Sequence, residues 1–416
     1  MLISKKNKCR SCGEFIKPFL RFGKMPIANA FYDKIDYKKQ YFYNMDACFC
    51  KKCFCFQLLN VPKPSKMFHN KYAYFASTSI YMQNHWKKLS DVIKKNNKSN
   101  NLKIIIDIGS NDGIFLKNFV KSKSWLPIGI EPSKNVANFS KKTGLKNIIS
   151  EFFNYDLSKK IITKFKQKAQ IITSTNTMHH IENTNSVFKG VKNLLDSGGQ
   201  FITEDPSLYE MIKKGSYDQI YAEHMYIWSA LSLEIMSEKH GLYLYDIENN
   251  RVHGGCTRYF FCHHGRFKRT IRCSNYLKRE IKLGLNQLKT FHNFGKKSIS
   301  HSKKLYKLVK ELKSQGKKIC CYTAPAKGTT LVNFSRLDNK LIDKIFDNTP
   351  FKIGKYMPGE NKINVYSTDK FREESFDYIL LLAWNHKAEV LKKEQKFTRK
   401  IGAKWIVPMP KLKIIN

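Results

Sequence analysis

Short apolar runs alternate with helix-length segments through the middle of the chain, and this alternation constrains the fold more than any other feature. Gly, Pro, Asp or Asn closes each run, as expected of strands that end in tight turns. The first four runs are residues 102–109, 126–132, 170–176 and 198–206. Because alternating strands and helices form a mostly parallel sheet with helices packed on it, the sequence predicts an α/β architecture.

A helix and two further strands follow this parallel set. Ser229 is a suitable N-cap, apolar residues recur every four positions after it, and Gly241 stops the helix. Residues 242–249 and 256–264 have the apolar, β-branched and aromatic composition of strands. This order predicts an antiparallel edge on the parallel sheet.

A second alternating unit lies nearer the C-terminus. A basic segment with a helical pattern occupies residues 266–315, and apolar runs alternate with helix-length stretches over residues 317–410. Two prolines in residues 61–66 mark a linker. Since 416 residues exceed the size of a single core, we predict three domains, at residues 1–66, 67–265 and 266–416.

Two CxxC pairs lie in the first of these domains. Cys9 and Cys12 form one pair, and Cys50 and Cys53 form the other. Four thiolates at this spacing favour a tetrahedral zinc site, and such a complete ligand set indicates a structural metal. The alternatives are incidental buried cysteines, or a substitute ligand from the flanking Cys48 or Cys55.

The net charge of +42 would suit a nucleic acid or another anionic partner. Lysines are spread along the whole chain together with abundant Asn and Ile, which favours a biased proteome composition. A phosphate-bearing substrate is the second explanation, and nucleic acid is the third. No run approaches 18 apolar residues and no signal peptide is recognisable, so we expect no membrane insertion. Eleven cysteines, six of them before residue 56, favour the reducing cytoplasm.

Residues 104–115 have the pattern of a strand, a Gly-containing turn and a helix. Gly109 and Gly113 permit close backbone approach, and a helix start offers free N–H groups to an anionic or carboxylate-bearing ligand. Glu131 lies 22 residues after Gly109, at the position where an acid binds ribose hydroxyls. The pattern favours a nucleoside-containing cofactor. A bare structural turn is the alternative, because the motif is not GxGxxG.

Taken together, these motifs resemble the three-domain nucleotide-sugar C-methyltransferases, which use S-adenosylmethionine to methylate 4-keto-deoxysugars. The resemblance covers nearly the whole chain. The matching stretches are CRSCG, FGKMPIANAF, CKKCFCFQL, DIGSNDGIF, GIEPS, NTMHHIEN, YDQIYAEHMYIWS, VHGG and YTAPAKGTTLVNF. It implies an α/β chain with a small zinc-binding N-terminal module, a Rossmann-like class I methyltransferase domain and a second, smaller Rossmann-like α/β domain. It also implies a monomer.

The resemblance implies two cofactors, S-adenosylmethionine and a structural Zn²⁺. The residues expected to bind S-adenosylmethionine are Asp107, Gly109, Asn111, Asp112, Gly113, Glu131 and Asn176.

A base and an oxyanion donor are needed to methylate a carbon beside a ketone, because the carbon must first lose a proton. Histidine suits the base because its unperturbed pKa lies near neutrality. The resemblance implies that His224 is this base, with Tyr221, Glu223 and His180 beside it. Glu223 would orient the imidazole or bind a sugar hydroxyl, and Tyr221 would donate to the oxyanion. Spacing alone also fits packing roles for all four residues.

The resemblance places further side chains against the nucleotide sugar. These are Tyr81 or Tyr74 before the cofactor strand, His253 in VHGG, and Tyr322 and Lys327 in YTAPAKG. Lys327 is expected to contact the diphosphate, although the order KG rules out a P-loop. His253 also fits a turn, and Tyr74 and Tyr81 also fit packing roles. Two departures from the family are Cys256, where a serine is usual, and the tandem pair formed by His179 and His180.

The sequence therefore predicts methyl transfer to a sugar carbon, most simply C3, of a nucleotide-linked 4-keto-deoxysugar. One alternative is an RNA methyltransferase, which the charge and the zinc module favour. The chain has no RNA-reading aromatic motif and no Arg-rich segment, so nucleic acid is not the expected partner. The other alternative is a non-catalytic protein that binds nucleotide sugars, and the candidate base argues against it.

Overall fold

The computed structural model describes residues 2–4, 7–34, 36–67, 75–99, 101–250 and 252–416. Tyr74 lies outside the described residues, and so does the side chain of His253. Among the described helices, none has both the length and the apolar character that crossing a membrane requires.

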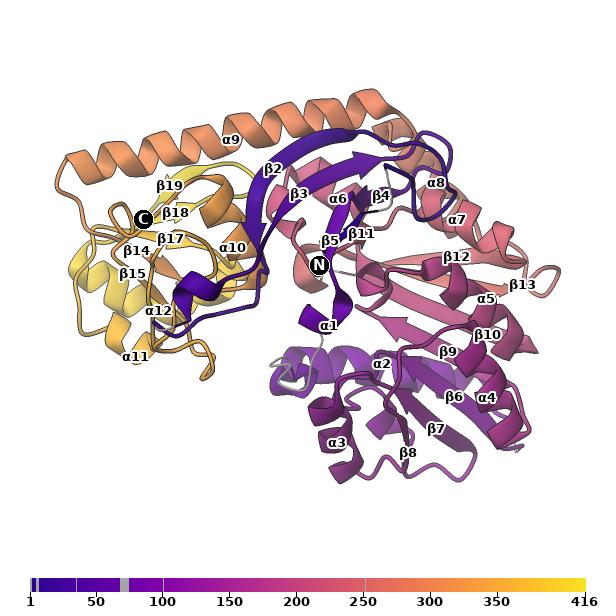
Figure 1. Ribbon diagram of the computed structural model, residues 1–416. Coiled ribbons are helices and arrows are strands. Elements are labelled where there is room, and N and C mark those ends of the chain that lie inside the picture. Colours follow the sequence, from indigo (N-terminus) through magenta and orange to yellow (C-terminus); the bar gives the residue numbers. More distant parts are fainter. Residues whose placement is uncertain (1, 5–6, 35, 68–74, 100, 251) are drawn as a thin grey trace.

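A seven-stranded sheet forms the middle of the chain, with the order β12-β13-β10-β9-β6-β7-β8 (Figure 1). Neighbouring strands are parallel except where β13 pairs with β10 and with β12. The strands are β6 (Lys103–Ile108), β7 (Trp125–Ile130), β8 (Asn147–Ile149), β9 (Ala169–Thr175), β10 (Leu195–Pro206), β12 (Leu242–Asn250) and β13 (Cys256–His263). The structure confirms the predicted Rossmann-like sheet and its antiparallel edge.

Helices connect these strands and pack on the sheet. They are α2 (Ile80–Asn96), α3 (Lys134–Lys142), α4 (Tyr155–Phe165), α5 (Thr184–Leu194), α6 (Leu208–Lys214) and α7 (Ala230–Lys239). The predicted start of α7 is confirmed, because the Ser229 side chain accepts from the backbone N–H of Ser232 in a capping box. Gly241, at φ +70°, follows the end of α7.

The helix predicted directly after the Gly-containing turn is wrong. Residues 111–119 form turns and a short 3-10 helix, η3 (Leu116–Asn118). Asn111 and Gly113 have φ values of +49° and +78°, and an α-helix cannot continue through left-handed residues. Residues 111–119 therefore continue the loop as a series of turns, and no regular α-helix begins there.

The N-terminal part is built on a four-stranded antiparallel sheet with the order β11-β4-β3-β2. Its strands are β2 (Pro18–Pro26), β3 (Phe42–Phe49), β4 (Phe56–Leu58) and β11 (Tyr226–Ile227). The last strand comes from the segment that carries the candidate base, and Tyr226 pairs with Gln57. A strand pair of β1 (Leu2–Ser4) and β5 (Asn60–Pro62) and the short helix α1 (Pro64–Met67) complete this part.

A six-stranded sheet near the C-terminus has the order β16-β15-β14-β17-β18-β19, and only β19 is antiparallel to its neighbour. The strands are β14 (Ile319–Tyr322), β15 (Lys344–Phe346), β16 (Val365–Tyr366), β17 (Tyr378–Leu381), β18 (Lys404–Val407) and β19 (Lys413–Ile415). Its helices are α10 (Ala326–Phe334), α11 (Thr368–Phe371) and α12 (Lys387–Ile401). This confirms a second, smaller α/β unit, although β16 and β19 were not predicted.

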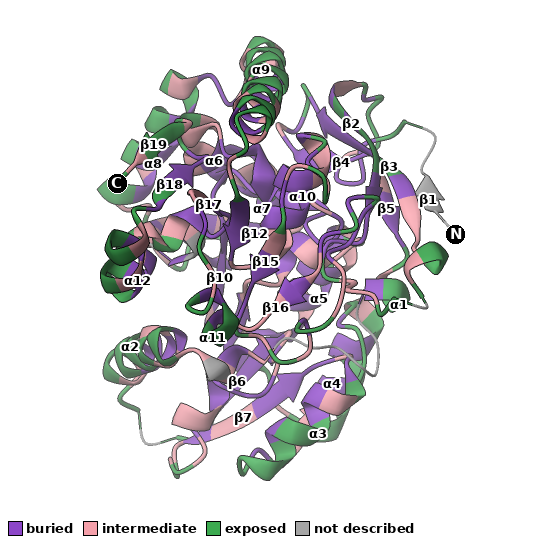
Figure 2. Ribbon diagram, turned by 90° about the vertical axis from the view of Figure 1, so that its left-hand side faces the viewer, coloured by how far each residue is buried: buried purple, intermediate pink, exposed green. Residues whose placement is uncertain are grey.

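Two helices, α8 (Ile271–Leu283) and α9 (Leu288–Ser314), join the two larger sheets. The predicted basic segment, residues 266–315, contains both helices, and α9 runs along the outside of the molecule from the N-terminal sheet to the C-terminal sheet (Figure 1). The helix α9 packs against the N-terminal sheet, because its Phe291 stacks on Phe49 of β3 with ring centroids 4.0 Å apart. Figure 2 shows buried strands in the interior and exposed outer faces on α3, α9 and α12.

Candidate active site and zinc centre

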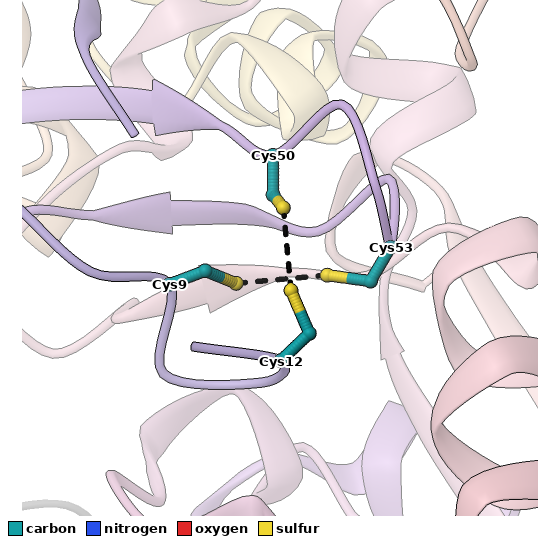
Figure 3. Close-up of side chains that lie close together, drawn as sticks. All are labelled: Cys9, Cys12, Cys50 and Cys53. Atoms are coloured by element: carbon teal, nitrogen blue, oxygen red, sulfur yellow. Dashed lines mark hydrogen bonds between the residues drawn. The ribbon is translucent and has the colours of Figure 1, made fainter. Parts of the chain in front are cut away.

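The four cysteines of the two CxxC pairs come together, with their sulfurs directed at one centre (Figure 3). The Sγ atoms of Cys9 and Cys53 are 3.5 Å apart, as are those of Cys12 and Cys50. Sulfurs around a tetrahedral zinc ion are roughly 3.8 Å apart for Zn–S bonds of about 2.3 Å. The donor set therefore fits a structural zinc ion.

Two turns hold these cysteines. Cys50 and Cys53 lie in the turn between β3 and β4, where the Cys50 N–H donates to the carbonyl of Cys55 at 3.0 Å. The Gln57 side chain donates to the Sγ of Cys9 at 2.9 Å. Such outer hydrogen bonds orient metal ligands. Because Gln57 lies on β4, which pairs with β11, the metal centre is linked to the segment of the candidate base.

A cleft of about 1910 Å³ opens between the three parts of the molecule. Its wall includes Asn29 from the N-terminal part, Asp107 and Asn176 from the ends of central strands, and Lys327 and Lys352 from the C-terminal part. Side chains at the carboxyl ends of parallel strands face such a crevice in open α/β sheets. The cleft therefore joins the candidate cofactor, catalytic and substrate residues.

Five of the seven predicted cofactor residues line this cleft, and they are Asp107, Gly109, Asn111, Glu131 and Asn176. Burial raises the pKa of Asp107 to about 7, and its Oδ1 accepts from Thr173 at 2.7 Å. Glu131 accepts from the backbone N–H groups of Asn111 at 3.1 Å and Ser133 at 2.8 Å. Both carboxyl groups therefore lie at the carboxyl ends of neighbouring strands, on the wall of the cleft.

Asp112 and Gly113 stand apart from the other predicted cofactor residues, because neither lines the cleft. The Oδ2 of Asp112 accepts from the backbone N–H of Ser77 at 2.8 Å and so holds the turn before α2. A Cβ on Gly113 would lie 2.2 Å from the Cδ1 of Leu145. Contacts within the loop account for the placement of both residues, and their predicted role toward the cofactor stays a prediction.

Gly109 permits a close approach that a side chain would prevent. It has φ +75°, and a Cβ there would lie 2.4 Å from the Cγ2 of Thr177. Gly109→Ala is expected to destabilise the loop by about 1–3 kcal/mol and to weaken S-adenosylmethionine binding about tenfold or more. Calorimetric titration measures the affinity. Gly198→Ala is the matched control, because its Cβ would meet its nearest neighbour at 3.4 Å. Equal affinities for the two variants would contradict this account.

His224 lies on the wall of the cleft and is only 7% exposed. Its Nδ1 is 2.8 Å from the carbonyl oxygen of Gln219, and the ring of Tyr221 lies against it, tilted by 33°, with centroids 3.8 Å apart. A ring that donates from Nδ1 to a carbonyl is left with a lone pair on Nε2. The geometry therefore presents His224 as a proton acceptor.

His180 and Glu223 lie beside His224 on the same wall. The Nδ1 of His180 is 2.6 Å from the carbonyl oxygen of Glu223, and burial lowers the pKa of His180 to about 4. Burial raises the pKa of Glu223 to about 7, and the Asn29 side chain donates to its Oε1 at 3.0 Å. All four residues of the predicted catalytic group are thus brought together.

Lys327 also reaches the cleft, at the start of α10. Its ammonium group bonds the side chain of Asn385 and lies 4.4 Å from the ring centre of Trp384. Burial lowers its pKa to about 8, against the opposing effect of Asp218. A half-buried cation at this position is suited to an anionic part of a ligand.

Two residues predicted to bind substrate, Tyr322 and Tyr81, do not line the cleft. Tyr322 is 2% exposed, and its hydroxyl donates to Glu394 at 2.6 Å inside the C-terminal unit. Tyr322 points away from the cleft because successive side chains of β14 face opposite sides of the sheet. Tyr81 is 60% exposed on the first turn of α2.

The sequence reasoning missed a pair of buried residues next to the candidate base. The Nδ1 of His179 lies 2.5 Å from the Oδ1 of Asp205 at the end of β10. Asp205 follows Glu204 at the end of the apolar strand. Two adjacent acidic residues at the end of a predicted strand are the feature of the sequence that could have indicated this pair.

Three family models match successive parts of the chain. They are a zinc binding domain over residues 9–68, a methyltransferase domain over residues 81–247 and a C-methyltransferase C-terminal domain over residues 251–410. These matches place the chain among the three-domain S-adenosylmethionine-dependent C-methyltransferases, with S-adenosylmethionine and a structural zinc ion as cofactors.

Among individual proteins, the chain is similar to the C-methyltransferase NovU of Streptomyces niveus. The two are 28% identical over 414 residues, which cover 99% of this chain and 97% of the relative. An S-adenosylmethionine-dependent methyltransferase from Clostridium acetobutylicum matches 45% of this chain and 94% of its own, with 13% identity and a TM-score of 0.34. Magnesium protoporphyrin IX methyltransferase from Synechocystis matches 44% and 88%, with 9% identity and a TM-score of 0.34.

Proposed function

We propose that this C-methyltransferase methylates C3 of a nucleotide-linked 4-keto-deoxysugar. One observation carries the proposal: a candidate base, five of the candidate cofactor residues and the half-buried Lys327 share a single cleft. A nucleotide-linked ketosugar has groups that suit all of them, namely an acidic C–H beside a ketone and a diphosphate. The inferred place of the reaction is the cytoplasm, since none of the eleven cysteines forms a disulfide.

Proton removal is assigned to His224. Its Nδ1 faces the Gln219 carbonyl, so its Nε2 is the atom that takes the C3 proton. Contact with the Tyr221 ring holds the ring plane, and a positioned base of this kind contributes about 10²–10⁴-fold to rate. His180, with its pKa near 4, stays uncharged beside it. Bound S-adenosylmethionine supplies the electrophilic methyl group.

Glu223 is assigned to bind hydroxyl groups of the sugar. Its side chain is held by a hydrogen bond from Asn29 of the N-terminal part. Because its pKa is about 7, Glu223 can accept from a hydroxyl as a carboxylate or donate to one as an acid. Tyr221 is the assigned donor to a ring substituent or to the ketone.

The diphosphate is assigned to the C-terminal wall of the cleft. Lys327, Lys352 and Lys355 lie on this wall. Lys352 is 8% exposed, donates to the carbonyl of Ala324 at 2.9 Å, and has a pKa lowered by burial. Lysines gathered at one end of a cleft concentrate positive potential where a diphosphate would bind.

Hydrogen exchange tests the proposed function directly. The wild-type protein is incubated in D2O with a nucleotide-linked 4-keto-deoxysugar, first without and then with S-adenosylmethionine. Deuterium uptake at C3 above the enzyme-free rate, followed by gain of one methyl group, is the expected result. A folded protein that binds S-adenosylmethionine but gives neither exchange nor methyl transfer with any nucleotide ketosugar would exclude the proposal.

Lys327→Met is expected to raise the KM for the nucleotide sugar about 10- to 100-fold, because a charge-assisted hydrogen bond contributes about 1.5–3 kcal/mol. The kcat should change little, since Lys327 is assigned to binding. Deprotonation removes the charge as pH rises through about 8, so the wild-type KM should increase above that pH. The variant should lack this increase. Lys340→Met, at an exposed position, is the control in the same assay. A variant KM equal to that of the control would remove Lys327 from the diphosphate site.

A further inference from the structure

A histidine–carboxyl pair is buried directly beside the candidate base. His179 is 2% exposed and Asp205 is fully buried. The Oδ1 of Asp205 lies 2.5 Å from the ring Nδ1 of His179 and 3.4 Å from its backbone nitrogen. Asp205 therefore determines both the position and the orientation of the His179 ring.

The other edge of this ring belongs to the catalytic wall. His179 lines the cleft, and its ring centroid lies 4.4 Å from that of His224 and 3.8 Å from that of His180. Each of the three rings contributes a nitrogen to a group whose members lie within 4.8 Å of one another. Since Nδ1 of His179 faces Asp205, Nε2 is the atom on the opposite edge of the ring.

We propose that His179, held by Asp205, is a hydrogen-bond donor that stabilises the enolate oxygen while His224 removes the C3 proton; this inference rests on the proposed function. The C–H electron pair becomes the C3–C4 double bond, and the C4 oxygen takes the negative charge. The proton moves to Nε2 of His224, and Nε2–H of His179 donates to the C4 oxygen. When C3 is methylated the C4 carbonyl forms again, and His224 releases its proton to water.

The protonation of the pair supports this role. Burial raises the pKa of Asp205 to about 8, so the pair keeps an additional proton at neutral pH. The Oδ2 of Asp205 has no hydrogen-bond partner among the described residues, so a proton there would be unsatisfied. At neutral pH the pair therefore carries two protons. One lies between Oδ1 of Asp205 and Nδ1 of His179, and the second is on Nε2 of His179, whether the shared proton belongs to the carboxyl group or to the ring.

Other ionisable groups surround the pair. The negative charge of Glu204 also raises the pKa of Asp205. The rings of His180 and His224 lie against His179, and Cys256 and Tyr259 interact with Asp205, while Tyr221 and Glu223 share the wall of the cleft. Because the pair loses its proton as pH rises through about 8, the donor is present below that pH and is lost above it.

The pH dependence of C3 exchange in the holoenzyme tests the proposal with two variants. His179→Phe keeps a ring but no donor, so kcat for exchange should fall about a hundredfold with little change in KM. In Asp205→Asn an amide that donates to Nδ1 leaves hydrogen on Nε2. This variant should exchange within about tenfold of wild type, but should lose the decline above pH 8 that the wild type shows.

Nitrogen NMR of ¹⁵N-histidine-labelled protein gives a readout that needs no sugar. The signal missing from His179→Phe identifies His179, and its Nε2 should be protonated at pH 7 and lose the proton near pH 8. An unprotonated Nε2 at pH 7 would overturn the proposal. Unchanged deuterium exchange at C3 in His179→Phe would also overturn it. A third contrary result would be a second zinc ion in each wild-type chain that is absent from His179→Phe, because His179 would then be a metal ligand. If the wild type itself fails to exchange, the proposed function fails, and the nitrogen signal still decides the state of His179.

Discussion

Replacing His224 with alanine is expected to lower the rate of methyl transfer about a thousandfold, within the range that a positioned general base contributes. The loss should appear in kcat, because the imidazole takes up a proton only as the transition state forms. His224 is held in place by a hydrogen bond from Nδ1 to the Gln219 carbonyl and by contact with the Tyr221 ring. His224→Ala loses these two contacts and keeps the rest of the segment, so we expect the variant to fold and to bind S-adenosylmethionine as tightly as the wild type.

Deuterium uptake at C3 without S-adenosylmethionine separates proton removal from methyl transfer and should fall together with kcat. His264→Ala serves as the control, since the His264 side chain is 53% exposed and pairs with Glu238 outside the cleft. If His224→Ala exchanges at the wild-type rate, the base lies elsewhere, and His180 becomes the first residue to test.

Replacing Cys50 with serine is expected to remove the zinc ion and unfold much of the N-terminal part. Structural zinc contributes about 10–16 kcal/mol of binding free energy in small zinc-finger peptides. The cost here should be smaller, because buried strands also hold this part together. The loss should spread to the active site, since β4 pairs with β11 directly after the catalytic segment. Zinc content and thermal unfolding measure the effect.

Cys48→Ser is the matched control for this substitution. Cys48 is equally buried and lies two residues from Cys50, but it lies outside the group of four sulfurs. It should retain the zinc ion and most of the activity, at a cost typical of burying a hydroxyl group, about 1–3 kcal/mol. Loss of zinc from both variants to the same extent would show that Cys48 takes part in the metal site.

Local patterns carried much of the prediction. Alternating apolar runs identified most strands of both larger sheets, because side chains buried on both faces of parallel strands form near-continuous apolar stretches. Ser229 marked the start of α7 through the chemistry of an N-cap. The two CxxC pairs indicated a zinc site because the spacing within each pair is set by a single turn.

The failures have a different physical origin. The left-handed conformation of Asn111 ended a helix that the local pattern favoured. Tyr322 lies in a motif with the expected composition, but the pleat of β14 turns it into the core and leaves Lys327 at the cleft. Asp205 and His179 meet only because β9 and β10 are neighbours in the sheet, so that the ends of the two strands lie together.

The sequence by itself determined the α/β architecture and the four zinc ligands, since each depends on residues close together in the chain or on a motif of fixed spacing, whereas the group around His224 came from the family resemblance. The tertiary structure alone decided which side chains share the cleft. It joined Asn29 to Glu223 and His179 to Asp205, pairs separated by 194 and 26 residues. Long-range packing sets such contacts and the burial that shifts their pKa values, and neither is encoded in local spacing.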